Sequence, residues 1–436
     1  MKPWEARPSI FVPNNAAIST LLRWLVSLAA GLPALAATTP PVFYKDVLPI
    51  LQNRCQECHR PGEIAPMHFL SYADTRPWAK AIREAVLTRK MPPWFADPQF
   101  GHFANDRSLS RDEIETLLHW VDAGALEGSP KDAPPARAWP AGWNIGTPDA
   151  VLEMPHAIPI PASGAIEYQY IILPTRFSED KWVQQVEVRP SDAATVHHAV
   201  VYIRDPGSDW LQGRPSGEAF ALPIAKSLTT SDILLVYTPG NSFDGWKPGM
   251  AKKIKAGSDL VLQMHYTAKG KPTADRTRIG MIFAKETPKQ AVLTLQMGND
   301  KFVIPPGEAN YRVPVSGTLP NDALLISLFP HMHLRGKAFE YLVAMPNSGF
   351  TTLLRVSNYD FNWQLNYRLA QPLLLPAGTR LACAGYFDNS ANNPRNPDSQ
   401  AEVRFGEQSW EEMMIGFFDV AVDAGIDKTT FFQRRR

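Results

Sequence analysis

The stretch Val196-His197-His198-Ala199-Val200-Val201-Tyr202-Ile203 combines an apolar run rich in β-branched and aromatic residues with two adjacent histidines. An apolar run of this kind, bounded by turn-forming residues, is typical of a β-strand. Comparable runs, separated by Pro, Gly, Asn and Asp turns, lie on both sides of it: 168–173, 182–188, 233–237, 260–266 and 324–329. This rhythm predicts antiparallel β-sandwiches for most of the chain.

The composition agrees with a β-rich, multidomain protein. The 436 residues are enough for two or three domains, and the 40 prolines suit strand edges and turns better than helix interiors. Lys and Arg number 44 against 43 Asp and Glu, which leaves a formal net charge of +1. Such a balance gives no reason to expect nucleic acid or an anionic membrane surface as a partner.

A different pattern precedes the β-rich part. Cys55-Gln56-Glu57-Cys58-His59 has the C-x-x-C-H spacing of covalent c-type heme attachment, with Cys55 and Cys58 forming the thioethers and His59 facing the iron. A thioredoxin-like dithiol would need a βαβ surround, and a zinc site a second pair of ligands. Neither is visible, so the motif favours one covalently bound heme c.

The surroundings of this motif predict a small helical domain. Helices are expected over 44–54 and 74–90, and Ser110-x-x-Glu113 is a capping box that opens a third. This arrangement resembles a class-I-like cytochrome c. Met91, in Met91-Pro92, is the preferred sixth heme ligand, because a thioether opposite His suits electron transfer. Met67 and His68 compete for this role.

Several histidines fall in the β-rich part in an informative pattern. His331 and His333 are spaced i, i+2, which puts both rings on one face of a strand. His197 and His198 are adjacent, so both can face one side only at a bulge or a strand end. His265 lies in another apolar run. Imidazoles with a thioether partner favour copper, and this pattern predicts metal binding.

The order His-His, Gln-x-His-Tyr, His-x-His and Glu-Met resembles the copper type II, ascorbate-dependent monooxygenases, which include the peptidylglycine and dopamine hydroxylating enzymes. The resemblance spans roughly residues 148–420. It implies two jelly-roll-like sandwich domains facing across a solvent cleft, one copper ion on each. The resemblance places His197, His198 and His265 at an electron-transfer copper. It places His331, His333 and Met413 at the oxygen-activating copper, with Met414 as the alternative.

The chain departs from the peptide-amidating branch of this family in ways that bear on the substrate. Where that branch has a carboxylate-binding Arg, Asn and Tyr, this sequence has Phe329, Ile415 and Phe417. A less polar molecule than a peptide is therefore expected. Disulfides also stabilise the fold of the animal enzymes, whereas beyond the heme motif this chain has only Cys383.

These observations predict a small all-α cytochrome c domain followed by two all-β jelly-roll-like sandwich domains. The expected segments are a signal peptide (1–36), the heme domain (37–126), a Pro-rich linker (127–145), and two β-domains (146–286 and 287–436). The signal predicts export, to the periplasm or beyond, with no stable membrane insertion after cleavage.

The function expected from this organisation is hydroxylation of a C–H bond in a small, apolar or weakly polar molecule. O₂ is the co-substrate, and electrons from an external donor pass through the heme. His331, His333 and Met413 would form the reactive site. The alternatives are a non-catalytic heme and copper protein for electron transfer or copper binding, and an oxidase with no organic substrate.

Overall fold

The computed structural model describes residues 39–222 and 231–433. The expected signal peptide, residues 1–36, lies outside the described residues. From residue 41 onward the described chain belongs to one compact unit.

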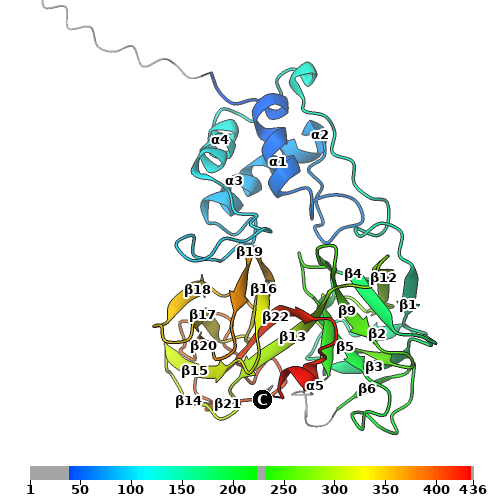
Figure 1. Cartoon of the computed structure of the whole chain (residues 1–436). Coiled ribbons are helices and arrows are strands. Elements are labelled where there is room, and N and C mark those ends of the chain that lie inside the picture. Colours follow the sequence, from blue (N-terminus) through cyan, green and yellow to red (C-terminus); the bar gives the residue numbers. More distant parts are fainter. Residues whose placement is uncertain (1–38, 223–230, 434–436) are drawn as a thin grey trace, which may run out of the picture. The chain divides into compact units, whose positions relative to one another are not determined.

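Short helices form the first part of this unit, drawn in blue and cyan in Figure 1. Their bounds are η1 (Phe43–Val47), α1 (Leu48–Arg54), α2 (Tyr72–Thr75), η2 (Arg76–Trp78), α3 (Ala79–Leu87) and α4 (Arg111–Asp122), followed by η3 (Pro130–Asp132). The capping box is confirmed, because the Ser110 side chain accepts from the backbone of Glu113 and the Glu113 side chain accepts from the backbone of Ser110. The helices that the sequence predicted are thus present, the second of them broken at Arg76–Trp78.

The helices share a hydrophobic core of their own. Phe43, Leu51, Leu117 and Trp120 have no exposed surface and lie at its centre. The C-x-x-C-H motif follows α1 in a turn, in which the backbone N–H of His59 donates to the carbonyl of Cys55 at 2.9 Å. The turn keeps the motif at the end of the helix, where Cys55 packs against the edge of this core and Gln56 is buried.

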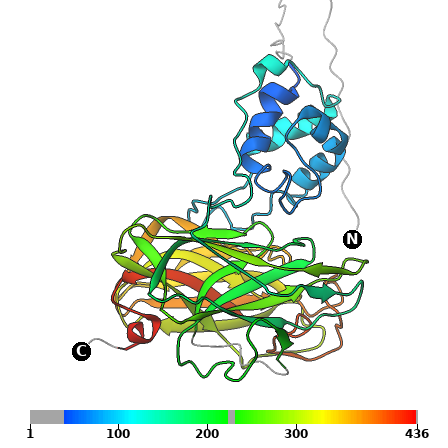
Figure 2. The same cartoon turned by 90° about the vertical axis from the view of Figure 1, so that its right-hand side faces the viewer.

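The rest of the chain is mostly β-sheet, as the sequence predicted, and Figure 2 shows the strands from a second side. One sheet has the order β1 (Ala150–Glu153), β12 (Arg278–Phe283), β4 (Lys181–Arg189), β9 (Met250–Ile254), β13 (Gln290–Gly298), β22 (Ile415–Asp423), β16 (Ala323–His331), β19 (Tyr367–Leu375), with β8 (Phe243–Gly245) on β4. A second has the order β6 (Ala219–Ala221), β3 (Gln169–Pro174), β10 (Asp259–Tyr266), β5 (Val196–Arg204), β7 (Asp232–Tyr237). A third has the order β15 (Tyr311–Thr318), β20 (Arg380–Phe387), β17 (Gly336–Ala344), β18 (Thr351–Val356). The pairs β2 (Ile158–Ile160) with β11 (Thr273–Asp275) and β14 (Val303–Ile304) with β21 (Val403–Arg404) are separate, and α5 (Lys428–Phe431) lies near the C-terminus.

The long sheet crosses the expected boundary at residue 286. It does so where β9 and β13 pair in parallel, through Gln290 with Met250 and Ala291 with Ala251. The hydrophobic cores nevertheless stay apart. One draws its buried residues from 154–281 and another from 291–431. The two β-rich segments therefore keep separate interiors while sharing a hydrogen-bonded sheet, which brings strands from both close together.

Among the described residues, none of the helices combines the length and the apolar character that crossing a lipid bilayer requires.

Candidate metal and heme sites

The adjacent histidines lie at an irregularity of β5. His265 on β10 pairs with His198, but the next residue, Tyr266, pairs with Val196, so the register shifts and His197 is the extra residue. This irregularity is the one that two adjacent histidines need in order to face the same side of a strand. The expectation of a bulge at this point is confirmed.

His197, His198 and His265 lie close enough to share one ion. One ring nitrogen of each falls within 4.8 Å of the others. The Nδ1 atoms of His197 and His198 are only 3.1 Å apart. A tetrahedral metal with imidazole bonds of about 2.0–2.1 Å needs ligand nitrogens about 3.3 Å apart, so the His197–His198 spacing is already suitable and rotation of the rings would bring in His265.

The electrostatics of these rings also fit a metal. Burial lowers the pKa of His197 to about 4, and burial with the neighbouring histidines lowers the pKa of His198 and His265 well below the usual value. The rings are therefore neutral at pH 7, the state in which imidazole offers a lone pair. Within the described part of the chain, His197 Nε2 and His265 Nδ1 are buried without a hydrogen-bond partner. Unpaired buried nitrogens in a neutral cluster are what a metal ion would satisfy.

His331 and His333 come from the end of β16 and the residues after it. Their ring centroids are 5.2 Å apart, and His333 has no exposed surface. The Nδ1 of His331 is 2.7 Å from the Oε1 of Gln364, whose own amide donates to the carbonyl of Phe361 at 3.2 Å. This fixed amide makes Nδ1 the protonated nitrogen and leaves Nε2 free to bind a metal. Burial lowers the pKa of His331 to about 4.

The pairing of β16 with β22 bears on Met413 and Met414. His331 pairs with Ile415, so continuing this antiparallel register sets Met332 opposite Met414 and His333 opposite Met413. Residues directly opposite each other share a face of the sheet. Met332 and Met414 are both in the hydrophobic core, which leaves Met413 on the face of His333. This favours Met413 over Met414 as the thioether ligand.

Glu412 joins the two segments that carry these residues. One of its carboxylate oxygens accepts the backbone N–H of His333 at 2.9 Å, and the other accepts that of Arg335 at 2.6 Å. The carboxyl is fully buried, and this burial raises its pKa to about 8. Glu412 therefore fixes the backbone beyond His331 against the strand that brings in Met413.

The two groups of histidines meet in one place. The ring centroids of His198 and His331 are 6.1 Å apart, and both side chains are buried. Phe361 stacks on His197 at 4.3 Å and lies 6.0 Å from His333. The resemblance implied a solvent cleft between these groups, whereas here the shared β9–β13 pairing holds the two segments together. These residues are called the histidine cluster below: His197, His198, His265, His331 and His333.

A cavity of about 970 Å³ lies beside the helices. Its wall includes all the predicted heme residues, namely Cys55, Cys58, His59 and Met91. The volume is near the upper end of the range of about 300–1,000 Å³ that cofactor sites occupy. The wall is largely apolar, with Phe69, Trp78, Ile82, Val86 and Leu117 among its residues. The cavity continues to Thr195, Val196 and His197, so it reaches the histidine cluster. We call it the heme cavity.

The ring of His59 is held by two contacts. Its Nδ1 lies 3.1 Å from the carbonyl oxygen of Met67, and the ring stacks on Phe69 at 4.3 Å. Donation to a carbonyl keeps the proton on Nδ1 and leaves Nε2 available to a metal. Burial raises the pKa of Cys55 to about 12 and that of Cys58 to about 11, so both are neutral thiols. Met67 lines the same cavity as Met91, and the choice of sixth ligand stays a prediction.

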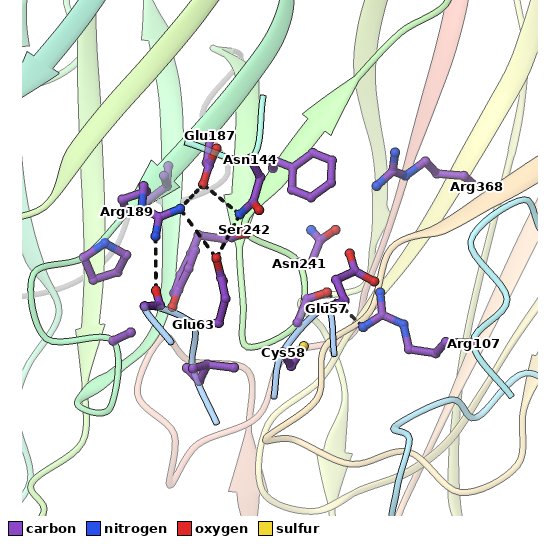
Figure 3. A pocket seen from close by; sticks show the side chains of 18 residues that line it. Glu57, Cys58, Glu63, Arg107, Asn144, Glu187, Arg189, Asn241, Ser242 and Arg368 are labelled. Atoms are coloured by element: carbon purple, nitrogen blue, oxygen red, sulfur yellow. Dashed lines mark hydrogen bonds and ion pairs between the residues drawn. The ribbon is translucent and has the colours of Figure 1, made fainter. Parts of the chain in front are cut away.

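A small polar cavity lies on the other side of Cys58 (Figure 3). Arg189 at the end of β4 pairs with Glu187 at 2.7 Å and with Glu63 at 3.7 Å, and Glu187 also accepts from Asn144 at 3.1 Å. Glu63 is four residues after His59, so these ion pairs attach the loop after the heme motif to the β-sheet. Burial raises the pKa of Glu63.

Some residues near the histidine cluster were not found from the sequence. Phe361 and Gln364 come from the segment between β18 and β19, which has no metal-ligand spacing, and Ser409, 3.2 Å from Nε2 of His265, has none either. Gln263, two residues before His265 on β10, donates through its amide to the hydroxyl of Tyr170. His102, His119 and His156 are exposed and lie outside the histidine cluster.

The sequence matches no protein-family model and no curated protein at a significant level. Among solved structures, PNGF-II is 9% identical over 63% of this chain, with a TM-score of 0.28, and the chain spans 65% of its length. The VP2 subviral particle of infectious bursal disease virus is 8% identical over 67% of this chain and 77% of its own, with a TM-score of 0.20. Likeness at this level carries no argument about fold or activity.

Proposed function

We propose that this protein is an exported copper-dependent monooxygenase that hydroxylates a C–H bond of an apolar or weakly polar small molecule. Electrons would reach the copper ions through the protein's own c-type heme. The observation that carries the proposal is the position of His197. Its ring belongs to the histidine cluster and also lines the heme cavity beside the C-x-x-C-H residues.

The net reaction sets what the site has to supply. A substrate R–H, O₂, two electrons and two protons give R–OH and water, and a one-electron donor outside the chain is used twice per turnover. When bound, two copper ions and one heme c would supply the redox chemistry and the affinity for O₂. The residues of the chain hold these groups and limit the access of water.

Each part of the histidine cluster has a task in this proposal. His197, His198 and His265 would hold the copper next to the heme, because they are the group that reaches the heme cavity. His331, His333 and Met413 would hold the oxygen-activating copper. Gln364 fixes the ring of His331, and Glu412 fixes the backbone of His333.

The surroundings of His331 support an apolar substrate. The rings of Phe329 and Phe417 are 6.1 Å apart, and Phe417 is 6.3 Å from the ring of His331. No cationic side chain replaces the carboxylate-binding Arg of the peptide-amidating branch at these positions. A carboxylate brought there would lose its hydration without gaining a partner.

The proposal also includes the division of the chain into domains. Residues 37–126 would form a cytochrome c domain, and residues 146–286 and 287–436 two jelly-roll-like domains. The main helical core and the two main β-cores support this division, while Trp94 and Phe103 pack against the core of 291–431 and Phe417 against residues of 168–261.

The proposal is tested with protein matured in a host that attaches c-type heme and then loaded with copper. The protein receives ¹⁸O₂ and reduced ascorbate or a small cytochrome, with a panel of apolar aromatic and aliphatic compounds. We expect one ¹⁸O atom in a hydroxylated product and none with His333→Ala. Product without ¹⁸O, or no product, would contradict the proposal.

A second candidate is a heme and copper protein that transfers electrons without an organic substrate. The complete burial of His333 and the 6.1 Å between the rings of His198 and His331 favour it, since electron transfer needs short distances and no substrate access. Heme oxidation by copper without O₂ consumption would support this candidate. O₂ consumption with all ¹⁸O in water would indicate an oxidase instead.

A further inference from the structure

Basic residues line the heme cavity from both parts of the molecule. Arg54, Lys90 and Arg107 come from the helical part, and Lys269 follows β10 in the β-sheet part. Arg54 is already paired with Glu113 at 3.0 Å. The carboxylates of Glu57 and Glu84 also line the cavity. The cations available to a ligand are therefore Lys90, Arg107 and Lys269.

Arg107 is placed between the heme cavity and the small polar cavity, since it lines both (Figure 3). One of its terminal nitrogens donates to the carbonyl of Gly240 at 3.1 Å. Its Nε is buried and, among the described residues, has no hydrogen-bond partner. Arg107 and Cys58 both line the heme cavity. A buried guanidinium N–H without an acceptor is destabilising, and an anionic ligand would satisfy it.

Lys269 reaches the same cavity from the other side. It comes four residues after His265, its side chain is exposed, and it forms no ion pair in the described part of the chain. It lines the heme cavity together with Thr195, Val196 and His197. A cation thus stands at the end of the heme cavity that meets the histidine cluster.

We propose that Arg107 and Lys269 bind the two propionate carboxylates of the heme, so that the cofactor is held by the helical part and the β-sheet part together. The inference rests on the proposed function, because it requires the heme. A heme brings two carboxylates into a largely apolar cavity, and buried carboxylates need cationic or N–H partners. The planar guanidinium of an arginine can donate two parallel hydrogen bonds to one carboxylate, whereas the ammonium of a lysine acts as a point charge.

The test compares Arg107→Gln, Arg107→Lys and Lys269→Gln with wild-type holoprotein. Lys271→Gln is the matched control, an exposed lysine two residues away that does not line the cavity. Lys90→Gln removes a cavity cation to which the proposal gives no role. Heme content comes from the pyridine hemochrome, the midpoint potential from a redox titration, and the propionate contacts from the propionate bending bands in resonance Raman spectra.

We expect full covalent heme in every variant. The midpoint potential falls in Arg107→Gln and Lys269→Gln, because removing a cation beside the heme favours the ferric state. The propionate bands shift in both variants. In Arg107→Lys the midpoint potential stays close to the wild-type value, but the propionate band shifts. Lys271→Gln and Lys90→Gln match the wild type in both measurements.

Heme attached normally, with potentials and bands unchanged in Lys269→Gln and Arg107→Gln, would overturn the assignment and leave the proposed function intact. An equal fall in Lys90→Gln would overturn it as well. Absence of covalent heme from the wild-type protein would instead be a failure of the proposed function. If Arg107→Gln does not fold, Arg107→Lys and the exposed Lys269→Gln still decide the question.

Discussion

The histidine cluster and the heme cavity meet at His197 but are built in opposite ways. The cluster is made of residues from β5, β10 and the end of β16 with the turn after it, and its largely buried rings are held by Gln364, Ser409 and the packing of Phe361. The heme cavity is made largely of turns and helix ends, and encloses about 970 Å³.

The difference follows from the size of what each would bind. An ion needs a few nitrogens at fixed distances, and paired strands set those distances without a large space. A porphyrin needs a wide apolar cavity, whose wall can be complete only when the cofactor fills it. We therefore expect the histidine cluster to keep its shape without metal and the helical part to depend on its heme.

The largest effect should come from removing the thiols of the heme motif. In Cys55→Ser/Cys58→Ser we expect complete loss of covalent heme and rapid proteolysis within residues 41–126, because the cavity wall loses the group that fills it. Acid-acetone extraction followed by the pyridine hemochrome measures the first effect, and limited proteolysis with mass spectrometry measures the second. Cys383→Ser, in the β-core, is the control and should retain all its heme. Protease resistance equal to that of the wild type would contradict the expectation that the helical part depends on its heme.

The next effect concerns copper. In His198→Ala and in His331→Ala we expect each variant to lose about half of the bound copper, since each change removes a ligand from a different group. Elemental analysis after dialysis measures the ratio of copper to protein. The exposed His156→Ala should bind as much as wild type. Loss of all copper in either variant would mean that the cluster acts as one joined site.

Much of the fold could be predicted from the sequence, because its signals are local. The strand at Val196 to Ile203 was expected from its apolar run and is β5, and the capping box at Ser110 marked the start of α4. The adjacent histidines required an irregular strand, and the register shift at His265 supplies it. Spacing also brought His331 and His333 together.

What the sequence could not predict depends on contacts between distant segments. The β9–β13 pairing joins residues that no motif connects, and the rings of His198 and His331, from different sheets, lie 6.1 Å apart. Gln364 and Phe361 reach the histidine cluster from a segment without any ligand spacing. Lys269 is an ordinary exposed lysine in the sequence, and only the folded chain places it on the wall of the heme cavity.

The rigidity of the histidine cluster depends on Glu412, and its removal should destabilise the protein. Glu412→Ala leaves the backbone N–H groups of His333 and Arg335 buried without an acceptor, at about 1–3 kcal/mol each. We expect a loss of about 2–6 kcal/mol in the free energy of unfolding of the metal-free protein, measured by urea denaturation. Glu412→Gln should lose less, because one acceptor remains. Glu402→Ala, on the surface, should stay within about 0.5 kcal/mol, and an equal loss there would refute the role of Glu412.

A finer test concerns Gln364. Gln364→Leu removes the acceptor 2.7 Å from Nδ1 of His331, so the ring loses its fixed tautomer and orientation. We expect copper at the group of His331 and His333 to bind about 10–100 times more weakly, with the other group unaffected. Competition with a copper chelator measures the two affinities, and the exposed Gln400→Leu is the control. Equal weakening at both groups would show that Gln364 supports the whole cluster.

The smallest effect is the contribution of a single buried histidine to the dependence of stability on pH in metal-free protein. Burial lowers the pKa of His197 and of His331 to about 4, whereas in the unfolded chain it is about 6.5. The unfolded chain therefore takes up protons first. Stability is fully present above about pH 6.5 and is lost as the pH falls toward 4, by up to about 1.4 kcal/mol per pH unit for each histidine. The remaining members of the histidine cluster act in the same direction.

Urea denaturation between pH 5 and 6.5 measures this slope in a window where most carboxylates stay ionised. His331→Gln should give a shallower slope than wild type, because one buried neutral histidine is gone. His156→Gln should leave the slope unchanged, since that ring is exposed. An unchanged slope in His331→Gln would mean that the cluster opens to water without its metal. The histidine cluster would then depend on its ligand as much as the heme cavity does.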